Sequence, residues 1–109
     1  MRILMISKAC VVGAYQKKLE ELARLPGMEL TVVVPPYWRD ERGNMELERQ
    51  YTDGYELVVE KMAFNGHFHV YFYRGLAARL RALRPHVLHI DEEAYNLATW
   101  LALRAGRRL

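Results

Sequence analysis

The stretch LRPHVLHIDEEAYNLATW, residues 83–100, decides how the chain is expected to fold. Its apolar run at residues 87–90 ends directly in three acidic residues, Asp91, Glu92 and Glu93. An apolar segment of helical character follows at once. A buried strand that leads straight into a helix is the repeating unit of α/β proteins. The stretch therefore predicts a strand, a helix and a group of carboxylates at the junction between them.

Length and composition indicate one globular domain, residues 1–109, with a single core. A content of 51% hydrophobic and 27% charged residues is typical of a folded chain rather than a disordered one. No apolar run approaches the roughly 20 residues of a membrane span, and residues 1–6 enter a strand without a signal peptide. One cysteine, Cys10, fits a reducing compartment, so we expect a cytoplasmic protein.

The net charge of +3 does not predict a nucleic-acid partner. Arg104, Arg107 and Arg108 account for all of it, and the remainder of the chain is neutral. Nucleic-acid binding usually needs a basic face with aromatic or groove-fitting elements, and no such pattern is spread through the sequence. We therefore expect no nucleic-acid partner.

Strand-like and helix-like segments alternate along the whole chain. Segments rich in apolar and β-branched residues predict strands at residues 2–7, 28–34, 55–63 and 86–91. Apolar residues at helical spacing predict helices at residues 14–25, at the stripe of Tyr73, Leu76, Leu80 and Leu83, and at residues 94–105. This alternation predicts a Rossmann-like open α/β sheet, mainly parallel, with helices on both faces.

Two features do not fit a complete domain of this kind. The connection at residues 35–54 is long, which is typical of functional loops, and a short helix near residues 44–49 is one reading of it. The helix at 94–105 carries Arg104 as its only charge, and Trp100 and Leu103 lie off its main apolar stripe. A helix so apolar is normally covered by other structure. With only four strands, the chain is predicted to be the front part of something larger and to self-associate through this helix.

The acidic residues at 91–93 occupy the edge of the sheet where open α/β proteins bind ligands, beyond the carboxyl ends of the strands. Acidic residues there also stabilise the start of a helix by complementing its dipole, by about 0.3–1 kcal/mol each. This purely structural role would explain one or two of the three. The two explanations are evenly balanced for Glu93. Asp91 and Glu92 lie nearest the strand end and are the candidate catalytic residues.

A second candidate site is the turn at residues 7–13, between the first strand and the first helix. Free backbone amides and a positive helix end would face the same crevice there, and Gly13 would let a phosphate or sugar approach the backbone. A single glycine is neither a P-loop nor a dinucleotide fingerprint, so an ordinary turn glycine fits equally well. Cys10 has no base beside it and is expected to pack.

The segment FNGHFH, residues 64–69, is the third candidate. His67 and His69 could be combined with His89 and Asp91 into a zinc site. Histidines flanked by aromatic residues without a complete ligand set are more often packing residues, so we predict no metal. For His67 we expect a polar contact at the crevice.

Taken in order, five segments resemble the N-terminal domain of retaining GT-B glycosyltransferases of family 4, also called group 1. They are RILMIS, KLEELA, ELTVVVPPYWRDERG, FNGHFHVYFY and RPHVLHIDEEAYNLATWLALR, and the resemblance covers essentially all 109 residues. It implies a hexosyltransferase-like enzyme that moves a sugar from a nucleotide-sugar donor to an acceptor hydroxyl with retention, without a metal or other cofactor. It also implies a second Rossmann-like domain that holds the donor; without it, the 109 residues are expected to be inactive.

The same resemblance implies roles for the candidate residues. The loop from Lys8 to Gly13 would border the donor diphosphate, Asp91 and Glu92 would face the reacting sugar, and Glu93 would join them in binding substrate. His67 would lie in the acceptor region.

Two positions depart from the family pattern. Val12-Gly13 supplies one glycine where relatives often carry two, and Ala94 follows the acids where relatives often have proline. A lipid-linked acceptor would bring the enzyme to a membrane surface as a peripheral protein.

The rival hypothesis is a non-catalytic α/β module that binds a ligand or a partner chain through its apolar helix. A response-regulator receiver would need acids where Ser7 and Lys8 stand at the end of the first strand. A flavodoxin-like module would need a loop richer in Ser, Thr and Gly than residues 8–13. An interaction module thus remains the alternative to the enzyme.

Overall fold

A four-stranded parallel sheet forms the centre of the protein. The computed structural model describes residues 1–67, 70–92 and 96–107. The sheet has the order β5-β2-β1-β8, and all three neighbouring pairs are parallel. Its strands are β1 (Arg2–Ile6), β2 (Glu29–Val34), β5 (Glu56–Val59) and β8 (Val87–Ile90). The predicted α/β class with a parallel sheet is confirmed, and the strand order is compatible with a Rossmann-like fold.

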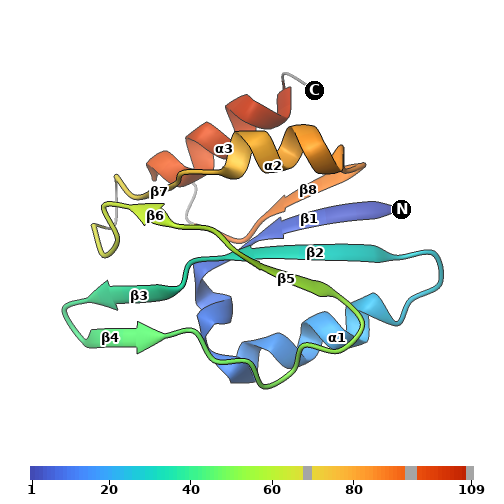
Figure 1. Cartoon of the computed structure of the whole chain (residues 1–109), viewed down its shortest axis with the longest axis horizontal. Helices are drawn as coiled ribbons and strands as arrows, with labels where there is room; N and C mark the ends of the chain where they lie inside the picture. The colour runs from blue at the N-terminus through green and yellow to red at the C-terminus, as the bar shows by residue number, and fades with distance from the viewer. Residues whose placement is uncertain (68–69, 93–95, 108–109) are drawn as a thin grey trace.

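Helices cover both faces of this sheet, as the alternation predicts (Figure 1). Helix α1 (Lys17–Ala23) lies on one face, and α2 (Leu76–Leu83) and α3 (Leu97–Arg107) lie together on the other. Side chains alternate along β1, so that Leu4 and Ile6 pack toward α2 and α3 whereas Met5 packs toward α1. The sheet therefore separates two apolar cores, one on each face, and the single core expected from length and composition is wrong. Among the described residues, no helix is long and apolar enough to cross a membrane.

Two antiparallel hairpins project beyond the carboxyl ends of the parallel strands (Figure 1). One pairs β3 (Tyr37–Asp40) with β4 (Gly43–Glu46), and the other pairs β6 (Met62–Ala63) with β7 (Phe72–Tyr73). The short helix considered near residues 44–49 is wrong. Met45 pairs with Trp38 across the first hairpin, and burial of Trp38 to 3% exposure favours the strand over the helix.

Several predicted boundaries also change. The predicted strand at 55–63 divides into β5 and β6, and between them the Glu60 carboxylate pairs with Arg79 of α2. Tyr73 belongs to β7 and not to the following helix. Two short 3₁₀ turns, η1 (Lys8–Val11) and η2 (Gly13–Gln16), precede α1, and η2 replaces the start of the helix predicted at residues 14–25. The predicted start of the last helix lies outside the described residues.

Candidate functional site

The ends of β1 and β8 meet at the point where the chain changes direction across the sheet. From β1 the chain proceeds to β2 and β5 on one side and then returns to β8 on the other side. Ser7 and Lys8 follow β1, whereas Asp91 and Glu92 follow β8. The Asp91 amide donates to the Ile6 carbonyl at 2.8 Å, which holds the two ends side by side. This is the topological switch point at which open α/β sheets bind ligands.

Asp91 keeps an accessible carboxylate at this point. Its residue is exposed, and Oδ2 accepts a hydrogen bond from the Ser7 hydroxyl at 2.8 Å. Ser7 itself is fully buried, so it binds the Asp91 carboxylate from the interior of the protein. An exposed carboxylate fixed in this way can accept a hydrogen bond from a ligand hydroxyl and orient it.

Glu92 has the opposite environment, because its side chain is 0% exposed. Its carboxylate accepts from the Lys8 amide at 3.1 Å and ammonium at 3.3 Å, and from the hydroxyls of Tyr71 at 2.6 Å and Tyr73 at 2.8 Å. Burial raises the pKa of Glu92, while the hydrogen bonds and the charge of Lys8 oppose that shift. Glu92 therefore ties four groups together and is closed to a ligand in this structure.

Lys8 is held inside the protein by the same cluster. Its side chain is 12% exposed, and Nζ lies 5.2 Å from the ring centre of Trp38 and 5.4 Å from that of Tyr71. These two rings pack edge to face with centres 5.0 Å apart. An ammonium over two aromatic faces and beside a carboxylate is stabilised from three sides. Lys8 thus stabilises the packed cluster. A ligand phosphate would have to compete with the Glu92 carboxylate for the Lys8 ammonium.

Tyr71, Tyr73 and Asn96 complete the buried network, and sequence reasoning did not identify them as site residues. Asn96 donates from Nδ2 to the Tyr71 hydroxyl at 2.8 Å and accepts the Thr99 amide at 2.9 Å near the start of α3. Burial raises the pKa of Tyr73 well above its usual range, and Glu92 adds to the shift. The alternation in Tyr71-Phe72-Tyr73 was the available signal, because it places both tyrosines on one face of a strand.

The turn at Gly13 is covered by a segment of the long connection. The Gly13 amide donates to the Glu48 carboxylate at 2.8 Å, and a Cβ on Gly13 would lie 2.5 Å from Gln50 Cδ. Buried Gln16 fastens this segment, since Nε2 donates to the Glu48 carbonyl at 2.6 Å and Oε1 accepts the Gln50 amide at 3.1 Å. The amide predicted to face a phosphate therefore already binds a carboxylate of the same chain. Gln16 escaped sequence analysis because it lies within a predicted helix.

His67 lies in the loop between β6 and β7, beyond the carboxyl ends of the sheet (Figure 1). It is exposed, and its ring packs edge-on against Phe64 at 6.3 Å between ring centres. Asn65 fixes this loop to β3, because Oδ1 accepts the Arg39 amide at 2.8 Å and Nδ2 donates to the Tyr37 carbonyl at 2.6 Å. The structure thus leaves His67 exposed to solvent, and Asn65 is the residue of the loop that sequence reasoning missed.

The remaining candidates add no second centre. Within residues 1–67, 70–92 and 96–107, no three His, Cys, Asp or Glu side chains come together as a metal site. Cys10 is buried, and burial raises the pKa of its thiol, which keeps it protonated and unreactive. His69 and Glu93 lie outside the described residues.

Comparison with known proteins does not assign the chain to a family. No protein-family model matches it, and neither the curated proteins nor the solved structures contain a significant match. Function therefore has to be argued from the site itself.

Proposed function

We propose that the chain is the acceptor-side part of a retaining glycosyltransferase of the GT-B type. Two lines support the proposal: the order of sequence segments that resembles this family, and a parallel sheet with polar residues at its switch point. The observation that carries it is the exposed carboxylate of Asp91, held by Ser7 beside the end of β1. In this proposal Asp91 accepts a hydrogen bond from the acceptor hydroxyl and orients it toward the donor sugar.

In this proposal Glu92 does not contact the acceptor and acts through Asp91. The four hydrogen bonds of Glu92 join the end of β8 to Lys8, to Tyr73 of β7 and to Tyr71 directly before β7. A carboxylate that immediately follows Asp91 and is fixed so firmly restrains the Asp91 backbone. Glu92 is therefore a positioning residue, and contact with the sugar is assigned to Asp91.

In this proposal a second domain holds the donor, and the donor diphosphate lies next to the Gly13 turn. For its diphosphate to reach the Gly13 amide, the Glu48 carboxylate has to leave that amide. His67, exposed beyond the sheet, is assigned to the acceptor side.

The rival function is a non-catalytic binding module, and one observation favours it. The Lys8 ammonium and the Gly13 amide, two groups assigned to phosphate, are both bound by carboxylates of the chain itself. A module without a donor would have no need to release them. Transfer activity decides between the two functions.

The test measures sugar transfer from a panel of nucleotide sugars by the longest natural chain that contains this segment. Asp91→Asn should lower turnover by at least about 10²-fold without lowering the melting temperature. Asp53→Asn is the matched control, because Asp53 is an exposed acid in the long connection. A natural chain that transfers no sugar, or an Asp91→Asn protein with unchanged turnover, would overturn the proposal.

A further inference from the structure

The helices α2 and α3 carry basic residues but no acidic residues within their own sequences. Neither Leu76–Leu83 nor Leu97–Arg107 contains Asp or Glu. Arg79 on α2 is partly exposed, and its charge is paired with Glu60 at 2.7 Å. Five other arginines lie on or beside the two helices and are exposed: Arg74, Arg81, Arg84, Arg104 and Arg107.

This charge is part of an asymmetry along the chain. Residues 1–60 contain eight basic and ten acidic residues, whereas residues 61–109 contain eight basic and only three acidic ones. The first segment includes α1 and the second includes α2 and α3, on opposite faces of the sheet (Figure 1). The small net charge of the protein thus conceals one distinctly cationic face.

Apolar side chains are exposed among these arginines. Trp100 is 54% exposed and Leu103 is 47% exposed. Trp100, Leu103, Arg104 and Arg107 follow the i, i+3, i+4, i+7 spacing of a single helix face, and they line one shallow hollow. The Arg104 guanidinium rests over the Trp100 ring at 5.4 Å. The outward face of α3 is therefore both apolar and cationic, while Ala98 and Ala102 on its other side are buried.

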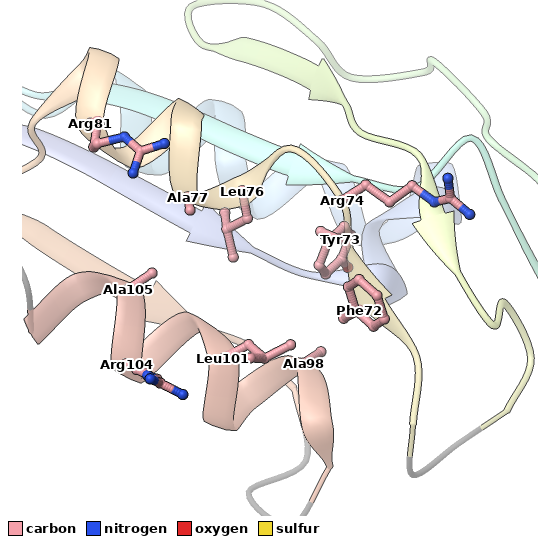
Figure 2. A pocket seen from close by; sticks show the side chains of 10 residues that line it. All are labelled: Phe72, Tyr73, Arg74, Leu76, Ala77, Arg81, Ala98, Leu101, Arg104 and Ala105. Carbon is pink, nitrogen blue, oxygen red and sulfur yellow. The ribbon is translucent and has the colours of Figure 1, made fainter.

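A groove runs between the two helices (Figure 2). Its volume is about 550 Å³, and its apolar lining includes Leu76, Ala98 and Leu101. Arg81 of α2 and Arg104 of α3 stand on its two sides. An apolar channel with a guanidinium on each side fits a hydrocarbon chain that bears an anionic head.

We propose that the α2–α3 face binds the surface of an anionic lipid membrane. Trp100 and Leu103 enter the headgroup region, the arginines bind lipid phosphates, and the groove accepts part of an acyl chain. The self-association predicted from the sequence of this helix stays an alternative, but a twofold contact centred on Arg104 and Arg107 would bring these like charges together. A protein partner fits less well too, since protein interfaces place charges around an apolar core and here the two kinds alternate along one helix face. The proposal does not depend on the glycosyltransferase assignment.

The experiment is co-sedimentation of the chain with vesicles of phosphatidylcholine, with and without phosphatidylglycerol. We expect binding to the anionic vesicles only, weakened by salt. Arg104→Glu with Arg107→Glu should lower the affinity at least about tenfold. The matched control, Lys17→Glu with Lys18→Glu, makes the same change of charge on exposed residues of α1 and should keep the affinity. Vesicles should also shift the tryptophan fluorescence to the blue, and Trp100→Phe should abolish that shift because Trp38 is buried.

Four results would overturn the proposal. They are failure to bind anionic vesicles at low salt, equal binding to phosphatidylcholine alone, and equal loss in the α1 control. The fourth is a preference for polyglutamate, single-stranded DNA or a second copy through Trp100, which would assign the face to a different kind of partner.

Discussion

Two cation–aromatic pairs stand in opposite surroundings. Lys8 lies over Trp38 inside the switch-point cluster, with Glu92 beside it and 12% of its side chain exposed. Arg104 lies over Trp100 on the outward face of α3, where both residues are exposed. Lys8 and Trp38 interact only with other parts of the fold, so removing either one should lower the stability of the protein. The second pair leaves its ring and charge to solvent, so its loss should cost binding and little stability.

The largest difference is expected from the two tryptophans. Trp38→Ala should lower the free energy of unfolding by about 3–5 kcal/mol, because it empties a buried site against Tyr71. Trp100→Ala removes a half-exposed ring and should cost less than about 1 kcal/mol. Urea denaturation of both variants measures the difference. Equal losses would show that the outward face of α3 is part of the core.

The two cations should differ in the same direction. Lys8→Met leaves the Glu92 carboxylate buried without its cation and should cost about 3 kcal/mol, reduced to the extent that Glu92 takes up a proton. Arg104→Met changes an exposed residue and should stay within about 0.5 kcal/mol of the parent. Chemical denaturation at neutral pH decides, and a Lys8→Met protein as stable as the parent would remove Lys8 from the framework of the site.

A smaller effect is expected when one donor to Glu92 is deleted. Tyr71→Phe keeps the ring against Trp38 but removes the hydroxyl that joins Glu92 to Asn96, and it should cost about 2 kcal/mol. Tyr55→Phe is the matched control, because the Tyr55 hydroxyl donates only to the exposed backbone carbonyl of Tyr51. Its cost should be about 1 kcal/mol or less. If the two variants have the same melting temperature, the Tyr71 hydroxyl contributes no more to stability than a surface hydrogen bond does.

The smallest effect is a dependence of stability on pH. Burial raises the pKa of Glu92 in the folded protein, so the folded state holds the proton more tightly than the unfolded chain. The stabilisation this provides is complete below the ordinary carboxyl pKa of about 4.3 and is lost as pH rises through the raised value. The free energy of unfolding of the parent, minus that of Glu92→Gln, should therefore fall as the pH rises above about 4.3. A difference that rises with pH would mean that Lys8 and the tyrosines outweigh desolvation.

The central strands were predictable because they are apolar on both faces. Residues 2–7 and 28–34 read as near-continuous apolar runs, and the structure places β1 and β2 in the middle of the sheet. The meeting of residues 7–8 with residues 91–92 also followed from the sequence, since parallel strands end at one edge. The β3–β4 hairpin was missed because burial of Trp38, a tertiary effect, overrode a weak local preference.

The opposite fates of Asp91 and Glu92 could not be predicted, although the two acids are adjacent. Their exposure depends on partners far along the chain, such as Lys8 at 84 residues and Tyr71 at 21 residues from Glu92. The roles of Asn65 and Gln16 could not be predicted for the same reason, because each side chain bonds backbone groups of a segment far along the chain.

The sequence by itself determined the alternation of four parallel strands with three helices, and the edge of the sheet at which the polar residues gather. Local periodicity and apolar content encode these features directly. Only the tertiary structure decided which charges are enclosed and which face solvent. Lys8 and Arg104 are both cations beside tryptophan, and burial depends on how the hairpins and helices close around each of them. That closure separates a residue that holds the site together from one that is free to bind.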